Sequence, residues 1–339
     1  MFFKKVACFT DIHFGLKGNS RIHNDDCETF IHWFIEQAKA EGCETCIFLG
    51  DWHHHRSATN VSTMNYTVSN VERLAKAFEK FYFINGNHDL FYRDKREINS
   101  VEYIRNIPNV HIVNDWIIKD DVAIIPWIIE DEWKRIQKLK VKYVFGHFEL
   151  PYFKMNAMVD MPDMGGIQTG HFTGCEKVFS GHFHKRQQAK NVTYIGNAFP
   201  HNYADAWDDD RGMMILEWDG EPKYINWPDM PRYITIKVSE LLADPEKYLK
   251  PKMYVRVTLD IKISYEEANF IRETFIDKYK LRELQLMPEQ IDRAQQPTVA
   301  VQKFDSIDQI VIKQLQGVES ETYDKNILTA IYNDLDVNN

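Results

Sequence analysis

Positions 80–89 read KFYFINGNHD, an apolar and aromatic run that ends in a glycine and three polar residues. The run over 80–85 has the length and composition of a buried β-strand. Residues that only build a core are apolar, whereas this strand is followed by a carboxamide, an imidazole and a carboxylate. Asn87, His88 and Asp89 are therefore expected to line a site. Together they offer a carbonyl oxygen, a titratable nitrogen and a carboxylate, which can bind a metal ion and move protons.

Four other strand-like runs end in the same kinds of residue. They run into Asp11-Ile12-His13, Gly50-Asp51, Gly146-His147 and Gly181-His182-Phe183-His184. In an open α/β sheet the carboxyl ends of the strands share one edge, so side chains far apart in sequence are expected to converge there. Each short motif is weak alone, because polar loops and surface histidines are common. All five in order, each after a strand, favour a site.

The expected donors are oxygens and imidazoles, without a thiolate. They are Asp11, His13, Asp51, Asn87, His147, His182 and His184. This set suits Mn²⁺, Fe²⁺ or Zn²⁺ better than a structural zinc site built from cysteines. Seven donors are too many for one tetrahedral ion but suit two ions that share a bridging carboxylate, and two ions roughly 3.5–4 Å apart clamp a phosphoryl group. His88 is left free to contact a phosphate oxygen or donate a proton.

Composition narrows the class of protein. The chain has 339 residues, 41 lysines and arginines and 50 acidic residues, which gives 41 minus 50, or −9. A strongly basic nucleic-acid footprint is therefore absent, although a local patch or a partner can supply positive charge. Five cysteines make no disulfide framework, and the sequence shows neither a signal peptide nor an apolar run of membrane-spanning length. A reducing cytoplasm is the expected location.

The first part of the chain alternates strand and helix patterns. Apolar residues recur at helical spacing over 27–40 and 62–80, between the first three strands. This β-α-β-α-β order favours a layered α/β fold. Beyond it, 110–113 and 122–127 are expected to pair as a hairpin. A charged helix over 130–140, a long loop over 150–175 and short, more antiparallel strands near 192–195, 212–218 and 223–227 complete this expectation.

The remainder of the chain is predicted to hold a small module and a terminal helical segment. Prolines 228 and 231 mark a boundary, followed by strand patterns at 233–238, 253–261 and 281–286. A helix over 264–279 has Ser264 as N-cap and Glu267 three residues on, which is a capping-box pattern. Short amphipathic helices are expected over 306–316 and 323–335, and we expect them to dock on a partner. The predicted divisions are 1–230, a module at 231–289, a linker at 290–303 and terminal helices within 304–339.

The order Asp-x-His, Gly-Asp, Gly-Asn-His-Asp, Gly-His and Gly-His-x-His resembles that of the calcineurin-like metallophosphoesterases, over residues 1 to about 230. Within that superfamily the chain is most similar to the SbcD-type DNA repair and recombination nucleases, and to those of T-even-like phages in particular. The resemblance implies mixed β-sheets flanked by helices, a small α+β capping module, C-terminal helices and two divalent ions, most often Mn²⁺.

Carried over motif by motif, the resemblance implies a role for each residue. One ion would be held by Asp11, His13, Asp51 and His184, and the other by Asp51, Asn87, His147 and His182, with Asp51 as the bridge. His88 would assist the leaving group or the transition state. His54, three residues after Asp51, would help to position the DNA backbone. His53 and His55 are expected to be solvent-exposed.

The implied activity is two-metal-dependent DNA cleavage, by an exonuclease or endonuclease, in recombination, repair and replication. The implied partners are double-stranded DNA ends and an SMC-type ATPase of the SbcC kind, with a homodimer of this chain inside a heterotetramer and no membrane. A phage-encoded protein of this type works in the host cytoplasm. Two alternatives stay open: a phosphatase or small-molecule phosphodiesterase with the same metal centre, and a non-catalytic adaptor that keeps the fold for binding.

Overall fold

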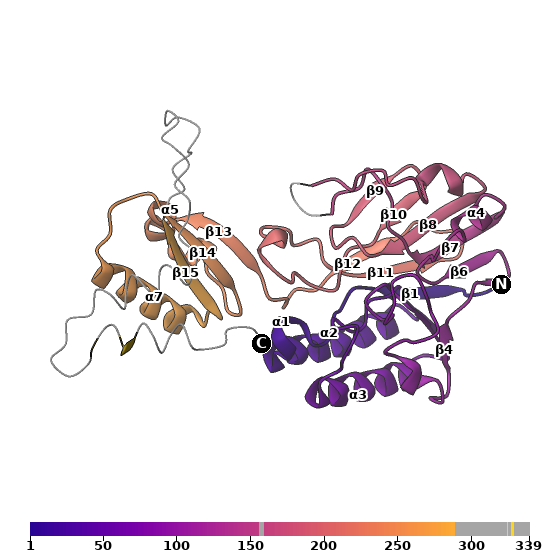
Figure 1. Cartoon of the computed structure of the whole chain (residues 1–339), viewed down its shortest axis with the longest axis horizontal. Coiled ribbons are helices and arrows are strands. Elements are labelled where there is room, and N and C mark those ends of the chain that lie inside the picture. Colours follow the sequence, from indigo (N-terminus) through magenta and orange to yellow (C-terminus); the bar gives the residue numbers. More distant parts are fainter. Residues whose placement is uncertain (156–158, 289–323, 325–326, 329–339) are drawn as a thin grey trace. The chain divides into compact units, whose positions relative to one another are not determined.

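A computed structural model describes residues 1–155, 159–288, 324 and 327–328. Three β-sheets organise this part of the chain (Figure 1). The strands are β1 (Lys5–Phe9), β2 (Thr45–Phe48), β3 (Lys80–Ile84), β4 (Val110–Val113), β5 (Ile117–Lys119), β6 (Val122–Ile125), β7 (Val141–His147), β8 (Cys175–Gly181), β9 (Gln187–Ala189), β10 (Val192–Tyr194), β11 (Gly212–Glu217), β12 (Lys223–Asn226), β13 (Tyr233–Lys237), β14 (Tyr254–Leu259) and β15 (Glu283–Pro288). The α-helices are α1 (Leu16–Asn19), α2 (Arg21–Ala40), α3 (Val61–Ala77), α4 (Trp133–Ile136), α5 (Val238–Ala243), α6 (Pro245–Tyr248) and α7 (Tyr265–Tyr279).

The first sheet has the order β12-β11-β1-β2-β3-β4. Strands β1 to β4 run parallel, and β11 joins antiparallel to β1. Successive residues of a strand point to opposite faces, so β1 serves two cores. Phe9 packs with Phe34 of α2, their ring centroids 4.5 Å apart, in the core beneath α2 and α3. Val6 and Cys8 instead face the core that the two large sheets share.

The second sheet has the order β5-β6-β7-β8-β10-β9. Tyr143 and Phe145 of β7 point inward to the core between the sheets, while Val144 points to an outer core that includes Ile136 of α4. The result is a layered arrangement. Helices α2 and α3 cover one face of the first sheet, the second sheet packs on its other face, and the outer core that includes Ile136 of α4 lies beyond the second sheet. This is the mixed α/β class that the sequence predicted, and every strand that carries a candidate ligand lies in one of these two sheets.

Two local predictions are wrong. The segment 110–113 does not pair with 122–127, because β4 lies parallel to β3 in the first sheet while β6 pairs with β5 and β7 in the second. By contrast, the strands predicted near 192–195, 212–218 and 223–227 do form antiparallel pairs, β10 with β9 and β11 with both β1 and β12, although β10 also lies parallel to β8. The predicted helix over 130–140 shrinks to α4, after Glu130 adopts a left-handed φ of 47° that a continuous helix does not tolerate.

The third sheet, β13-β14-β15, is wholly parallel and has its own apolar core with α5 and α7. The capping box predicted at the start of α7 is confirmed: Ser264 Oγ accepts from the Glu267 amide at 3.2 Å, and the Glu267 carboxylate accepts from the Ser264 amide at 2.8 Å. Residues Met1–Glu289 form one compact unit and Gln290–Asn339 another. The predicted linker and terminal helices lie outside the described residues, apart from positions 324 and 327–328. Among the helices described, none has the length and apolar character needed to cross a membrane.

Candidate metal centre

The candidate ligands lie where five strands of the two large sheets end. Asp11 and His13 follow β1, Asp51 follows β2, Asn87 and His88 follow β3, His147 ends β7, and His182 and His184 follow β8. The sequence predicted this convergence along a sheet edge, and the structure achieves it with two sheets whose carboxyl ends meet. Asp11, His13, Asp51, Asn87 and His147 are each at most 5% exposed. Buried acids and imidazoles brought so close together need charge compensation, which cations provide.

One group of donors surrounds Asp11. Ligand atoms of Asp11, His13 and Asp51 all lie within 4.8 Å of one another. His13 Nε2 lies 3.9 Å from Asp11 Oδ1 and 3.6 Å from Asp51 Oδ2, and His184 Nε2 lies 3.9 Å from Asp11 Oδ1. These separations suit donors that share one ion but are too long for hydrogen bonds between them.

A second group surrounds Asn87. Its side-chain oxygen lies 2.9 Å from His182 Nδ1 and 3.2 Å from His147 Nε2, and His147 Nε2 lies 3.4 Å from Asp51 Oδ2. His147 Nδ1 donates to the Leu49 carbonyl at 2.7 Å, which leaves Nε2 as the ligating nitrogen. Asp51 therefore belongs to both groups, as the bridging role requires. Oxygen and imidazole donors in two groups with a shared carboxylate fit two divalent ions.

Backbone strain concentrates at these residues. Asp11, His13, Asp51 and His182 all have left-handed backbones, with φ of 51°, 52°, 65° and 91°. Non-glycine residues adopt this region at a cost, and they keep it where the surrounding structure over-determines it, typically at functional sites. The left-handed turns aim side chains from the strand ends into the shared space.

Glycines beside the ligands keep that space open. A Cβ on Gly50 would lie 2.5 Å from His147 Nδ1, and one on Gly86 would overlap Asp51 Oδ1 and lie 2.5 Å from the Asp51 amide nitrogen. No side chain fits at either position without displacing a candidate ligand. The glycine of each Gly-Asp or Gly-Asn motif is thus part of the site's geometry.

Asp89 binds backbone instead of a ligand side chain. Its Oδ2 accepts from the amides of Asp51 and Gly86 at 2.9 Å, and its Oδ1 accepts from those of Trp52 and His53 at 2.9 and 3.1 Å. This fully buried carboxylate fixes the loop after β2 to the loop after β3. Burial and the nearby Asp51 charge raise the pKa of Asp89 to about 7, against the opposing effect of these amide donors.

The pKa shifts of several candidate ligands favour the protonation states that can bind a metal ion. Burial lowers the pKa of His13 well below its usual range, and burial also lowers the pKa of His182, so both imidazoles offer free lone pairs. Burial opposes charge on His147 too, but Asp51 and Asp11 outweigh it and raise the His147 pKa to about 9. The same attraction, against burial, holds the pKa of Asp51 well below its usual range. A cation held by Asp51 and His147 would replace the proton that this pairing keeps on His147.

His88 and His54 lie next to the first donor group. His88 Nδ1 donates to the His54 carbonyl at 2.7 Å, and the two rings stack with centroids 5.4 Å apart. The His88 amide donates to Asp51 Oδ1 at 2.8 Å, and the His88 ring lies 4.9 Å from that of His13. Burial, with help from His88 and His55, lowers the pKa of His54 to about 4.

The expectation that His53 is solvent-exposed is wrong. Its side chain is only 1% exposed, its Nδ1 lies 2.8 Å from the Ser100 hydroxyl, and its amide donates to Asp89. His55 is half-buried. In the Asp51-Trp52-His53-His54-His55 stretch, His53 therefore packs inward, and the adjacent His54 lies beside His88.

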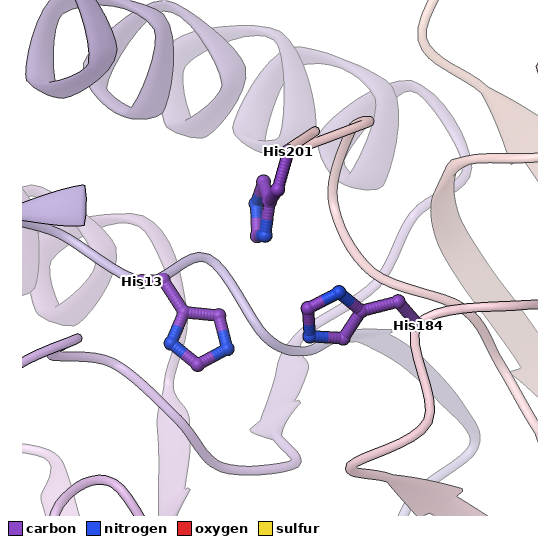
Figure 2. Close-up of side chains that lie close together, drawn as sticks. All are labelled: His13, His184 and His201. Atoms are coloured by element: carbon purple, nitrogen blue, oxygen red, sulfur yellow. The ribbon is translucent and has the colours of Figure 1, made fainter. Parts of the chain in front are cut away.

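Three further residues border the centre without a motif that announces them. Glu149 Oε1 lies 3.3 Å from His182 Nε2, and the Trp127 ring lies 5.2 Å from that of His182. His201 lies with His13 and His184 (Figure 2), with ligand atoms of all three within 4.8 Å of one another. Glu149 is two residues after His147, and this short separation from a candidate ligand is a weak indication in the sequence that Glu149 borders the site. His201 follows no strand motif, and only the fold brings it here.

Comparison with known proteins gives similar chains that are named as nucleases and as a phosphatase. The chain is 28% identical to Exonuclease subunit 1 of Enterobacteria phage T4 over 226 residues, which are 64% of this chain and 66% of that protein. The match thus spans just under two thirds of the relative.

Among solved structures, similar chains include the Pseudomonas putida nuclease MPE, at 17% identity over 53% of this chain and 61% of that one with a TM-score of 0.28. A dimetal phosphatase from Danio rerio is 10% identical over 63% of this chain and 92% of that one, with a TM-score of 0.41. Residues 4–186, more than half of the chain, match the family described as calcineurin-like phosphoesterase. The chain therefore belongs to the calcineurin-like phosphoesterase family, whose members use a dimetal centre.

Proposed function

We propose that this chain is a two-metal DNA nuclease subunit that cleaves phosphodiester bonds at double-stranded ends, with Mn²⁺ as the working ion. The observation that carries the proposal is the pair of donor groups that share Asp51. The T4 relative, named as an exonuclease subunit, supports a nucleic-acid substrate and a partner. The proposed partner is an SMC-type ATPase of the SbcC kind, with two copies of each chain in the complex.

The proposed roles follow the geometry. When bound, the two ions neutralise phosphoryl charge and activate water for attack. Asp11, His13, Asp51 and His184 would hold one ion, and Asp51, Asn87, His147 and His182 the other. Because His88 Nδ1 donates to the His54 carbonyl, His88 Nε2 is left to face the phosphate, and in the imidazolium form of the ring it carries the proton that it gives to the leaving oxygen. His54 would help to position the DNA backbone, and its carbonyl also holds the His88 ring in position.

A cavity beside the second donor group gives a substrate room. It has a volume of about 190 Å³, and its lining includes His147, Glu149, Trp127 and Trp133. Apolar and aromatic walls with a few polar groups are typical of binding sites. A nucleotide next to the scissile phosphate can stack on such aromatic faces.

A side-by-side assay tests the proposal against the phosphatase alternative. The full-length protein with Mn²⁺ is offered linear double-stranded DNA and a phosphoserine peptide, with Asp51→Asn as the inactive control. We expect DNA cleavage and no peptide dephosphorylation. Dephosphorylation without DNA cleavage would reject the nuclease assignment. A protein that binds no metal and cleaves neither substrate would support the adaptor alternative.

A further inference from the structure

His201 is a buried histidine without a partner inside the protein. Its side chain is 2% exposed, and neither ring nitrogen has a hydrogen-bond partner among the described residues. A buried polar group without a partner is costly, and native proteins usually satisfy it with a protein group, a water or an ion. The plain alternative is a neutral ring that packs among aromatics, since Phe199 and His23 lie 5.2 and 5.5 Å away.

The ring positions favour a shared ligand over simple packing. The centroids of His13, His184 and His201 form a nearly equilateral triangle, with separations of 5.4, 5.4 and 5.1 Å (Figure 2). A point equidistant from the three lies about 3 Å from each centroid, the distance expected when an imidazole nitrogen binds a metal at about 2.0–2.1 Å. Asp11 Oδ1 lies 3.9 Å from both His13 Nε2 and His184 Nε2, so it borders the same space.

The backbone holds His201 in place by contacts that are independent of its ring. The Asn197 amide donates to the His184 carbonyl at 3.0 Å, which fixes this segment beside the loop after β8. The His201 amide donates to Asp205 Oδ2 at 2.9 Å, and Asp205 is in turn paired with the buried Arg211 at 3.2 Å. The imidazole is thus presented by a rigid support, as a metal ligand needs to be.

We propose that His201 is an additional ligand of the first metal ion, beside Asp11, His13, Asp51 and His184. The first site then has three imidazoles and two carboxylates, whereas the second has two imidazoles, a carboxamide and the shared carboxylate. More nitrogen donors favour borderline transition metals such as Co²⁺ and Zn²⁺. The first ion is accordingly held more tightly than the second. The inference rests on the dimetal centre and not on the choice of DNA as substrate.

Cobalt binding to the full-length protein tests this assignment. Chelator-treated wild-type protein and His201→Phe are titrated with Co²⁺ by calorimetry and by visible absorption. Phenylalanine keeps the ring volume but has no nitrogen. We expect two Co²⁺ sites in the wild type and a loss of at least roughly 10–100-fold in affinity at the tighter site in His201→Phe, with a weaker and shifted cobalt spectrum. Phe199→Leu, which disturbs the neighbouring packing without removing a nitrogen, is the matched control and should bind as the wild type does.

Thermal unfolding of the metal-free proteins separates ligation from packing. His201→Gln is a second variant, because it keeps a polar side chain at this position but removes the imidazole nitrogens. Wild-type affinities and spectrum in a folded His201→Phe would overturn the proposal. An equal loss of metal affinity in Phe199→Leu, or metal-free forms of both His201 variants that fail to fold, would also overturn it in favour of a packing role. Because Co²⁺ binding requires no DNA cleavage, these outcomes do not depend on the proposed nuclease activity.

Discussion

In the proposed metal centre, some residues are assigned to hold the ions and others to position neighbouring groups. His88 is bound to protein through its Nδ1 and its amide, and its ring lies at the edge of the first donor group. Asp51 instead lies within both donor groups. The two residues are adjacent in space, but their removal should have different consequences for metal content.

His88→Ala is expected to keep both ions and lose most of its cleavage. Proton transfer by a positioned side chain contributes about 10²–10⁴-fold, so the cleavage rate should fall by a factor in that range. Asp51→Asn should lose metal from both sites, because a neutral amide is a poor bridge. Elemental analysis alongside a Mn²⁺-dependent cleavage assay distinguishes the two. Loss of both ions in His88→Ala would show that the role given to His88 is wrong.

Asp89 should matter through the backbone that it holds. In Asp89→Asn, a carboxamide nitrogen replaces one oxygen and faces two buried amides that then lack an acceptor. Each unsatisfied buried group costs about 1–3 kcal/mol, so the free energy of unfolding should fall by on the order of 2 kcal/mol or more. Urea unfolding of the metal-free protein measures this, and the exposed Asp94→Asn serves as the control. Equal midpoints for the two variants would contradict the role.

At the scale of elements, the loops that follow β2 and β3 touch through glycine. Gly86→Ala would place a methyl group against Asp51 Oδ1 and its amide nitrogen. Overpacking of this kind costs roughly 1–3 kcal/mol, and here the displaced group is the bridging carboxylate. We expect weaker metal binding at both sites by calorimetry and a lower unfolding temperature. Gly166→Ala, where an added Cβ meets nothing within 4 Å, should change neither, and comparable effects of the two changes would refute the steric argument.

Lys17 links α1 to β13 and β14. Its ammonium donates to the Tyr233 hydroxyl and lies 3.8 Å from the centroid of the Tyr254 ring. Although the Lys17 residue as a whole is exposed, desolvation of its ammonium, and secondarily Arg282, lowers the Lys17 pKa to about 8, against Asp26 and Glu283, which favour the charge. An unfolded lysine keeps its proton to about pH 10.4. Between these two values the unfolded state binds more protons, so this residue makes the free energy of unfolding rise with pH.

Lys17→Met should therefore flatten the pH dependence of stability. The difference in unfolding free energy between wild type and variant should shift in favour of the wild type from pH 7.5 to 9.5. The Tyr233 and Tyr254 hydroxyls stay protonated over this range, because burial raises the pKa of both. Urea denaturation at the two pH values provides the measurement, with the exposed Lys39→Met as control. Parallel curves for wild type and Lys17→Met would contradict the expectation.

Local sequence patterns predicted which segments form strands better than they predicted which strands pair with each other. The runs that end at Phe9, Phe48 and Ile84 were recognisable because buried parallel strands are almost continuously apolar. The segment 110–113 also has a strand-like composition. Its own sequence, however, does not indicate that it pairs with β3 instead of with the strand that follows it. His201 shows the same limit at the site: its position depends on contacts with Asp205 and on the path of residues 196–201, and no spacing rule encodes either.

At the scale of the whole molecule, two properties bear on the proposed partner. They are the net charge of the chain and its division into two units. A net charge of −9 is unfavourable for holding DNA alone, because counterion release requires lysine or arginine against phosphates. Residues Met1–Glu289 contain every candidate ligand and form one compact unit. All of the contacts described above for the candidate metal centre lie within that unit. The apolar stripes predicted from the sequence of the segment that follows suit a protein partner.

Truncation after Pro297 is accordingly expected to leave a folded, metal-loaded domain that no longer binds the proposed ATPase. The predicted stripes include Ile310 and Leu315, so Ile310→Glu with Leu315→Glu should abolish binding without truncation, because two buried charges at an apolar interface carry a large desolvation cost. A pull-down with the ATPase, run beside elemental analysis, measures both properties at once. A matched double change at polar positions of the predicted helix, Gln309→Glu with Gln316→Glu, adds the same two negative charges outside the apolar stripe and controls for altered charge. Full-strength binding by the truncated protein would place the docking site within residues 1–297 and would give the terminal segment a different purpose.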